Sequence, residues 1–256
     1  MSQTDSPNRF YNTYSSKRFR IEVAGLSEKG IKRKLNQDRF IIDELKDGIV
    51  AALADGMGGE PGGEKASALA VSGISAVKQI TENQEINFLV KIFHEIDQQI
   101  LAASETDHDA ENMGTTLTAL YISGQSAYWT HVGDTRIYLF RHNKLIQVTS
   151  DHTFAKFLLG EGEITPEQEK THYSQHILEQ CMGQGEINPE TGVIHLEQND
   201  LILMSSDGLH KPLGTSPIQS ILNSDESLKE KCDHLIRKTQ HAKGNDDITV
   251  VLIRLS

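Results

Sequence analysis

The chain has 256 residues, of which 25 are Lys or Arg and 36 are Asp or Glu, so its formal net charge is −11. This acidic balance argues against a general nucleic-acid or anionic-membrane binder, because both partners attract surfaces rich in Lys and Arg. Hydrophobic residues make up 37% of the chain, which is enough for a packed core. The two cysteines, Cys181 and Cys232, are too few for a disulfide framework.

The sequence contains no apolar run near the roughly 20 residues that span a bilayer, and its polar N-terminal residues lack the apolar stretch of a secretory signal. We therefore expect a cytoplasmic monomer without nucleic-acid or membrane partners. Residues 1–17, rich in Ser, Thr and Asn, are predicted to be a disordered leader. Residues 18–256 are predicted to form a single domain.

The first half of this domain has strand patterns followed by helical ones. Three β-like runs come first, at residues 19–27, 38–45 and 48–55. The glycine-rich segment 56–63 then leads into two stretches whose apolar residues have helical spacing, 64–80 and 86–104. We expect these two helices to face the same core.

Strand patterns then return in four short runs separated by turn-like dipeptides, at residues 115–123, 125–133, 135–143 and 144–150. They predict an antiparallel meander. Residues 151–190 are polar and only weakly periodic. A further strand from Asp200, a helix over 227–240 whose basic side chains are expected to face solvent, and a strand over 247–255 complete the chain. Because the helices are grouped rather than alternating with strands, the order favours an α+β fold with antiparallel sheets.

Acidic residues stand at the ends of the predicted strands, namely Asp38, Asp55, Asp134, Asp207, Asp246 and Asp247. Carboxylates that cluster in a partly desolvated site repel one another unless a cation lies among them. Oxygen ligands without Cys or paired His favour a hard ion, Mg²⁺ or Mn²⁺, over zinc. The alternative for each Asp taken singly is a turn or capping residue.

Gly56 follows Asp55 directly, and a residue without Cβ lets its backbone carbonyl turn toward the same ion. Arg33 lies five residues before Asp38 in a basic cluster and offers a planar fork for a phosphate. The alternative for that cluster is a solvated charge run. The spacing of His172 and His176 could also bind a metal on a helix, although no acid or Cys completes a convincing zinc set.

Seven segments together resemble the metal-dependent protein phosphatase family (type 2C Ser/Thr phosphatases), in its bacterial branch. In chain order they are RKLNQD (33–38), ADGMGGEPGGEKAS (54–67), MGTTL (113–117), HVGDTRIYL (131–139), TSDHT (149–153), SSDGL (205–209) and GNDDITVVL (244–252). The resemblance implies an α-β-β-α sandwich, in which two antiparallel sheets flanked by helices carry a metal site at one edge. It also implies a mobile flap at about 155–190, beside that site.

The resemblance implies two Mn²⁺ or Mg²⁺ ions as cofactors. Asp55 would bridge both ions, the Gly56 carbonyl would bind the second ion, and Asp207 and Asp246 would complete the first. A third, weaker ion would lie near Asp134, which would share it with Asp207.

The implied activity is hydrolysis of phosphoserine and phosphothreonine in proteins, by direct attack of a metal-bridging hydroxide. Arg33 would bind the substrate phosphate and Asp38 would hold a metal-bound water. The partners would be phosphorylated proteins, and the enzyme would oppose a bacterial Ser/Thr kinase. Three positions depart from family patterns: Gln37 replaces a frequent Glu, Met57 stands where animal members have a His, and Asp247 replaces the usual Asn.

Two alternatives to this function stay open. A catalytically inactive member of the family would bind phosphoproteins and regulate partners, but such proteins generally lack one or more metal aspartates and none is missing here. A regulatory phosphatase acting on an anti-sigma antagonist or a secretion-system component stays within the enzyme class. The sequence does not choose among pathways.

Overall fold

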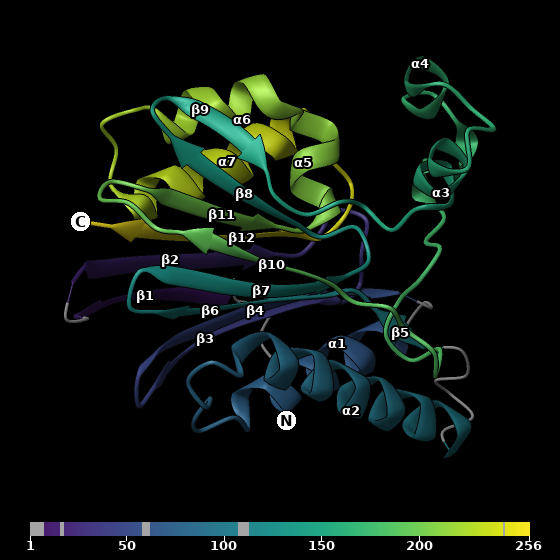
Figure 1. Ribbon diagram of the computed structural model, residues 1–256. Helices are drawn as coiled ribbons and strands as arrows, with labels where there is room; N and C mark the ends of the chain where they lie inside the picture. The colour runs from purple at the N-terminus through teal and green to yellow at the C-terminus, as the bar shows by residue number, and fades with distance from the viewer. Residues whose placement is uncertain (1–7, 16–17, 58–61, 107–112, 243) are drawn as a thin grey trace.

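A computed structural model describes residues 8–15, 18–57, 62–106, 113–242 and 244–256 (Figure 1). The strands of the first half are β1 (Asn8–Ser15), β2 (Arg20–Glu28), β3 (Asp38–Leu45), β4 (Gly48–Met57), β5 (Gly114–Thr115) and β6 (Leu117–Ser123). Those of the second half are β7 (Ser126–Val132), β8 (Arg136–Arg141), β9 (Lys144–Gln147), β10 (Glu190–His195), β11 (Leu201–Ser205) and β12 (Ile248–Leu255). The helices are α1 (Gly62–Ser75), α2 (Glu85–Thr106), α3 (Phe154–Gly160), α4 (Pro166–Glu169), the 3₁₀ helix η2 (Tyr173–His176), α5 (Asp207–Leu213), α6 (Thr215–Leu222) and α7 (Leu228–His241).

The strands form two stacked antiparallel sheets. One has the order β1-β2-β12-β11-β8-β9, and the other has the order β10-β7-β6-β4-β3 with β5 paired to β4. Helices α1 and α2 cover the outer face of the second sheet, while α5, α6 and α7 cover the outer face of the first (Figure 1). The α-β-β-α sandwich expected from the resemblance is therefore confirmed.

The central strands are buried on both faces, because each sheet lies between its partner sheet and a helix layer. On β6, Leu120 packs into the core between the sheets, whereas Leu117 packs under α1 and α2. On β12, Val251 faces the same central core and Val250 faces α5, α6 and α7. Strands buried in this way read as continuous apolar runs, and this is why the sequence predicted them.

Strand β1 corrects the expected disordered leader over part of its length. Residues 8–15 pair antiparallel with β2, and Tyr14 is buried in the core between the sheets. The remainder of the leader, residues 1–7 and 16–17, lies outside the described residues. The strand is at the edge of its sheet and contributes only Phe10 and Tyr14 to the core, so its apolar pattern is too sparse to predict it.

A second expectation, that the basic side chains of α7 face solvent, holds for Lys229, Arg237 and Lys238 but fails at one residue. Lys231 is buried instead, and its ammonium donates hydrogen bonds to the carbonyls of Ile221 (3.0 Å) and Leu222 (2.9 Å). These carbonyls lie at the end of α6, so Lys231 caps that helix from its neighbour α7. None of the described helices has both the length and the apolar character needed to cross a bilayer.

The segment 151–190 contains α3, α4 and η2, which stand apart from the sandwich at one end of it (Figure 1). Strand β5 ties the base of this segment to β4. Thr115 exchanges backbone hydrogen bonds with Met182, its amide donating at 3.2 Å and its carbonyl accepting at 2.8 Å. The hydroxyl of Thr115 also donates to the Asp55 carbonyl at 2.9 Å, so two residues link the end of the segment to Asp55.

Candidate metal centre

The sandwich brings five of the predicted acidic residues to one edge. Asp38 begins β3 where β4 ends, so Asp38 and Asp55 are cross-strand partners. The other sheet contains β11 and β12, which are antiparallel neighbours. Asp207 follows the end of β11 and Asp246 precedes the start of β12. Asp134 lies in the turn from β7 to β8, which passes from one sheet to the other. The expected convergence therefore occurs.

Asp38 is buried and half-satisfied. Its Oδ2 accepts a hydrogen bond from the Thr249 hydroxyl at 2.6 Å, which links the two sheets. Its Oδ1 has no hydrogen-bond partner among the described residues. Burial raises the pKa of Asp38 to about 7; the nearby carboxylate of Asp247 adds to this rise and the Thr249 bond opposes it. A buried carboxylate oxygen without a protein partner is satisfied by a proton, a water molecule or a cation.

Asp55 experiences the repulsion of the whole cluster. Burial raises its pKa well above the ordinary value, and four neighbouring carboxylates raise it further: Asp38, Asp207, Asp134 and Asp246. Its backbone is held by Thr116, whose hydroxyl accepts from the Asp55 amide at 2.9 Å. These charges are near enough to oppose ionisation of Asp55, and such crowding is relieved by divalent cations.

Asp134 is buried, and its partner is a residue that was not among the predicted site residues. Lys211 donates to Oδ2 of Asp134 and to Oδ2 of Asp207, each at 2.7 Å. Burial raises the pKa of Asp134 to about 6, with Asp207 adding to the rise and Lys211 opposing it. Lys211 lies four residues after Asp207 on α5, a spacing that could have suggested the contact had the helix been predicted.

Arg33 lies on the loop between β2 and β3, and its guanidinium forms an ion pair with Asp246. Asp247 anchors that loop at two points. Its Oδ1 accepts from the Gly30 amide and its Oδ2 from the Gln37 amide, both at 2.8 Å. The acidic residue at position 247 is thus a buried clamp for the loop that carries Arg33.

Gly56 stands where no side chain fits. A Cβ at this position would come within 2.1 Å of the Gly63 carbonyl oxygen and 2.8 Å of the Gln37 carbonyl oxygen. The backbone after Asp55 therefore runs against the start of α1 and the end of the Arg33 loop. Gly58 and Gly59, in the same glycine-rich segment, lie outside the described residues.

A second polar cluster lies behind Asp134. Candidate ligand atoms of His131, His152 and Glu190 lie within 4.8 Å of one another. Burial lowers the pKa of His131 to about 3 and that of His152 to about 4, so both rings are neutral. The Gly133 amide donates to Nδ1 of His152 at 3.2 Å, which fixes the turn that carries Asp134.

The spacing of His172 and His176 does not lead to a metal-ligand set in the part of the chain that the structure describes. His172 precedes the short helix η2 and His176 is its last residue. Nδ1 of His172 lies 2.7 Å from the Ser174 hydroxyl oxygen. The zinc alternative therefore has no further ligand there.

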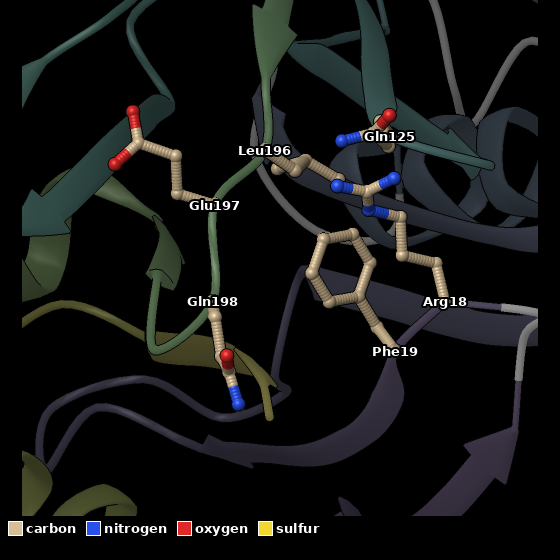
Figure 2. A pocket seen from close by; sticks show the side chains of 6 residues that line it. All are labelled: Arg18, Phe19, Gln125, Leu196, Glu197 and Gln198. Carbon is tan, nitrogen blue, oxygen red and sulfur yellow. The ribbon is translucent and has the colours of Figure 1, made fainter.

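A pocket at the other end of the strands has a volume of about 290 Å³ (Figure 2). It is lined by Arg18, Phe19, Gln125, Leu196, Glu197 and Gln198. Gln125 precedes β7, whereas Asp134 follows it, so the length of this strand separates the pocket from the acidic cluster. The pocket contains none of the predicted site residues.

The acidic cluster fits hard divalent cations. Its donors are carboxylate oxygens, with the Gly56 backbone beside Asp55, and Asp38 offers a buried unpaired oxygen. In the described residues, no three of these carboxylates have ligand atoms as close together as those of the His131 cluster. The hard-ion chemistry of the site follows from its oxygen donors.

Comparison with known proteins agrees with this geometry. The protein-family model for protein phosphatase 2C matches residues 31–249. The protein phosphatase PhpP of Streptococcus pneumoniae is 36% identical over 241 residues, covering 92% of this chain and 98% of that protein. The Listeria welshimeri serine/threonine phosphatase stp is 35% identical, covering 89% of this chain and 93% of that protein.

Solved structures agree with the fold. The S. agalactiae serine/threonine phosphatase superposes with a TM-score of 0.85 at 31% identity, covering 92% of this chain and all of that one. The catalytic domain of the phosphatase PstP, in complex with two manganese ions, superposes with a TM-score of 0.80 at 31% identity, covering 92% of this chain and 98% of that one. The chain therefore belongs to the protein phosphatase 2C family.

Proposed function

We propose that this chain hydrolyses phosphoserine and phosphothreonine in proteins and opposes a Ser/Thr kinase. The observation that carries the proposal is the convergence of Asp38 and Asp55 from one sheet with Asp207 and Asp246 from the other, beside Arg33. The relatives are named as protein phosphatases, and this supports the substrate class.

Two divalent ions, Mn²⁺ or Mg²⁺, would be held by a small set of side chains. Asp55 would bridge them with the Gly56 carbonyl beside it, and Asp207 and Asp246 would complete the set. When bound, such ions lower the pKa of water and neutralise negative charge on a phosphate. The raised pKa of Asp55, caused by burial and by its acidic neighbours, supports this assignment because cations would relieve the crowding.

Two residues would act on the substrate side. The free Oδ1 of Asp38 would accept a hydrogen bond from the attacking water and orient it, while Thr249 holds the other oxygen. Arg33, whose side chain is 41% exposed, would exchange its ion pair with Asp246 for a bidentate contact with the phosphate. Its guanidinium would then stabilise the charge on the phosphoryl oxygens during transfer.

The remaining parts of the proposal concern the chain as a whole. Residues 18–256 would be one catalytic domain, with 155–190 as a flap beside the site. Its tie to Asp55 through β5 supports a location near the chemistry. The cytoplasmic location, the monomeric state and the opposition to a bacterial Ser/Thr kinase stay predictions.

The proposal is tested by assaying the purified chain with an aryl phosphate and a phosphothreonine peptide, in Mn²⁺ and in Mg²⁺. We expect turnover that depends on metal and is lost in Asp207→Asn. Folded protein without turnover under either ion would refute the activity. Calorimetric titration with Mn²⁺ then separates an enzyme from an inactive phosphoprotein binder, because the inactive form is expected to bind metal poorly.

A further inference from the structure

Lys211 reaches into the acidic cluster from α5. Its ammonium donates one hydrogen bond to Asp207 and one to Asp134, both at 2.7 Å. These are the two side chains expected to share a third, weaker ion. We propose that Lys211 is a built-in cation that occupies the place of this third ion, so that the centre of this chain holds two divalent ions and one ammonium group.

The first argument is that Lys211 and an ion would compete for the same oxygens. Both contacts of Lys211 use Oδ2, the atom through which Asp134 and Asp207 face each other across the ammonium. A Mg²⁺ ion bound there would lie about 2.1 Å from each oxygen, within the space of the ammonium. Two cations so close together would also repel strongly in a partly buried site.

The second argument is that Lys211 is held in place. Asp207 and Lys211 lie four residues apart on one helix, so the backbone sets their separation. The Lys211 side chain is 24% exposed and Asp134 only 7%, so water offers little competition for this pair. A tethered group meets its partner at an effective concentration on the order of millimolar or above, which a weakly bound free ion must exceed to displace it.

The third argument is electrostatic. The cluster holds five carboxylates, and among the described residues Arg33 forms an ion pair with one of them, Asp246, and Lys211 with two others, Asp134 and Asp207. Lys211 neutralises the negative charge of Asp134, which would otherwise need an ion. It also holds Oδ2 of Asp207 and makes no bond to Oδ1 of that residue. Lys211 is thus a positioning residue for a metal ligand. This inference rests on the proposed function, because it takes the two-ion centre as given.

The test counts Mn²⁺ ions bound per chain, by calorimetric titration and by electron paramagnetic resonance of free Mn²⁺. Lys211→Asn removes the charge and offers an oxygen, and Lys211→Arg is the matched control that keeps the charge. We expect two ions in the wild type and in Lys211→Arg. Lys211→Asn is expected to take up a third ion at least tenfold more tightly than any extra uptake by the wild type. The double variant with Asp134→Asn is expected to lose that ion.

A wild-type chain that binds three ions, or a Lys211→Asn chain that binds only two, would overturn the role of Lys211 and leave the proposed function standing. A wild-type chain that binds fewer than two ions would overturn the two-ion function instead.

A measurement on the wild type keeps the proposal open to refutation if the Asn variant does not fold. The Lys211 side-chain ammonium, observed by NMR in protein saturated with diamagnetic Mg²⁺, is expected to stay slow in exchange and bound to both carboxylates. Release of the ammonium on adding Mg²⁺ would overturn the proposal.

Discussion

The guanidinium of Arg33 is paired with the carboxylate of Asp246 in the structure. The proposed function gives each of them another partner, a phosphate for Arg33 and a divalent ion for Asp246. Metal binding and substrate binding are therefore linked, because an ion at Asp246 frees the guanidinium that the phosphate needs.

We expect Arg33→Ala to raise the KM for an aryl phosphate by about 10–100-fold, the size of lost charge-assisted hydrogen bonds. Arg33→Lys keeps the positive charge but lacks the planar guanidinium, so its KM should lie between those of the wild type and Arg33→Ala. Because the side chain is 41% exposed, the thermal midpoint should not change. Initial rates over a range of substrate concentrations check this, and an unchanged kcat/KM would contradict the assignment.

Asp55→Asn separates a ligand from a structural acid. The variant removes the charge that four neighbouring carboxylates oppose, so the metal-free fold should gain about 1 kcal/mol, or roughly 2–4 °C in Tm. At the same time turnover and Mn²⁺ binding should be lost. Asp225→Asn, at an exposed position between α6 and α7, should change neither. Retained turnover in Asp55→Asn would rule out the metal role.

Gly56→Ala tests the close approach of three backbone segments. The added Cβ would lie 2.1 Å from the Gly63 carbonyl oxygen, so the strand or α1 must shift. We expect a loss of about 1–3 kcal/mol in unfolding free energy and a marked loss of Mn²⁺ affinity. Gly160→Ala, where a Cβ meets nothing within 4 Å, is the control and should be neutral. Urea denaturation and Mn²⁺ titration provide the readouts.

Asp247→Ala should detach the Arg33 loop. It leaves the buried amides of Gly30 and Gln37 without their acceptor, which costs about 1–3 kcal/mol for each unpaired group. Asp247→Asn keeps one carbonyl acceptor and should lose less. Hydrogen exchange at these two amides measures the effect, and protection that survives in the Ala variant would contradict it.

Proton release on metal binding follows from the raised pKa of Asp55, a proposed ligand, and from the raised pKa of its cross-strand partner Asp38, about 7; both are raised first by burial. Raised values mean that the metal-free fold loses stability as pH rises from 3.8 through 7, since it holds protons that the unfolded chain has released. Metal needs ionised ligands, so Mn²⁺ affinity should rise over the same range and level off above pH 7.

Calorimetry in two buffers of different ionisation enthalpy should detect more protons released per chain at pH 6.5 than at pH 8.5. Asp38→Asn should lower the release at pH 6.5. Equal release at the two pH values would show that these carboxyls are not involved.

The sequence alone predicts the central strands and the acidic set, because both depend on local patterns. Strand β3 alternates buried and half-buried residues, and its predicted limits match the observed Asp38–Leu45. The role of Gly56 beside the site was predicted only from its position directly after Asp55. Where the physical cause lies within a few residues, the sequence is sufficient.

The missed features depend on contacts between distant segments. Helix α5 has seven residues with Pro212 inside it, which hides its pattern, and without it Lys211 has no reason to meet Asp134. The clamp formed by Asp247 joins residues more than two hundred positions apart. Position 247 was interpreted only as one of the acidic residues at strand ends and as a departure from the usual Asn, since no local pattern reveals which amides a carboxylate will reach.

Strand β5 would give the proposed flap a fixed pivot. Thr115 is hydrogen-bonded both to Met182, near the C-terminal end of that segment, and to the backbone of Asp55, the proposed bridging ligand. If the proposed function holds, a movement of α3 and α4 that displaced Met182 would also displace Asp55, so closure of the flap and affinity for the ions would be mechanically coupled.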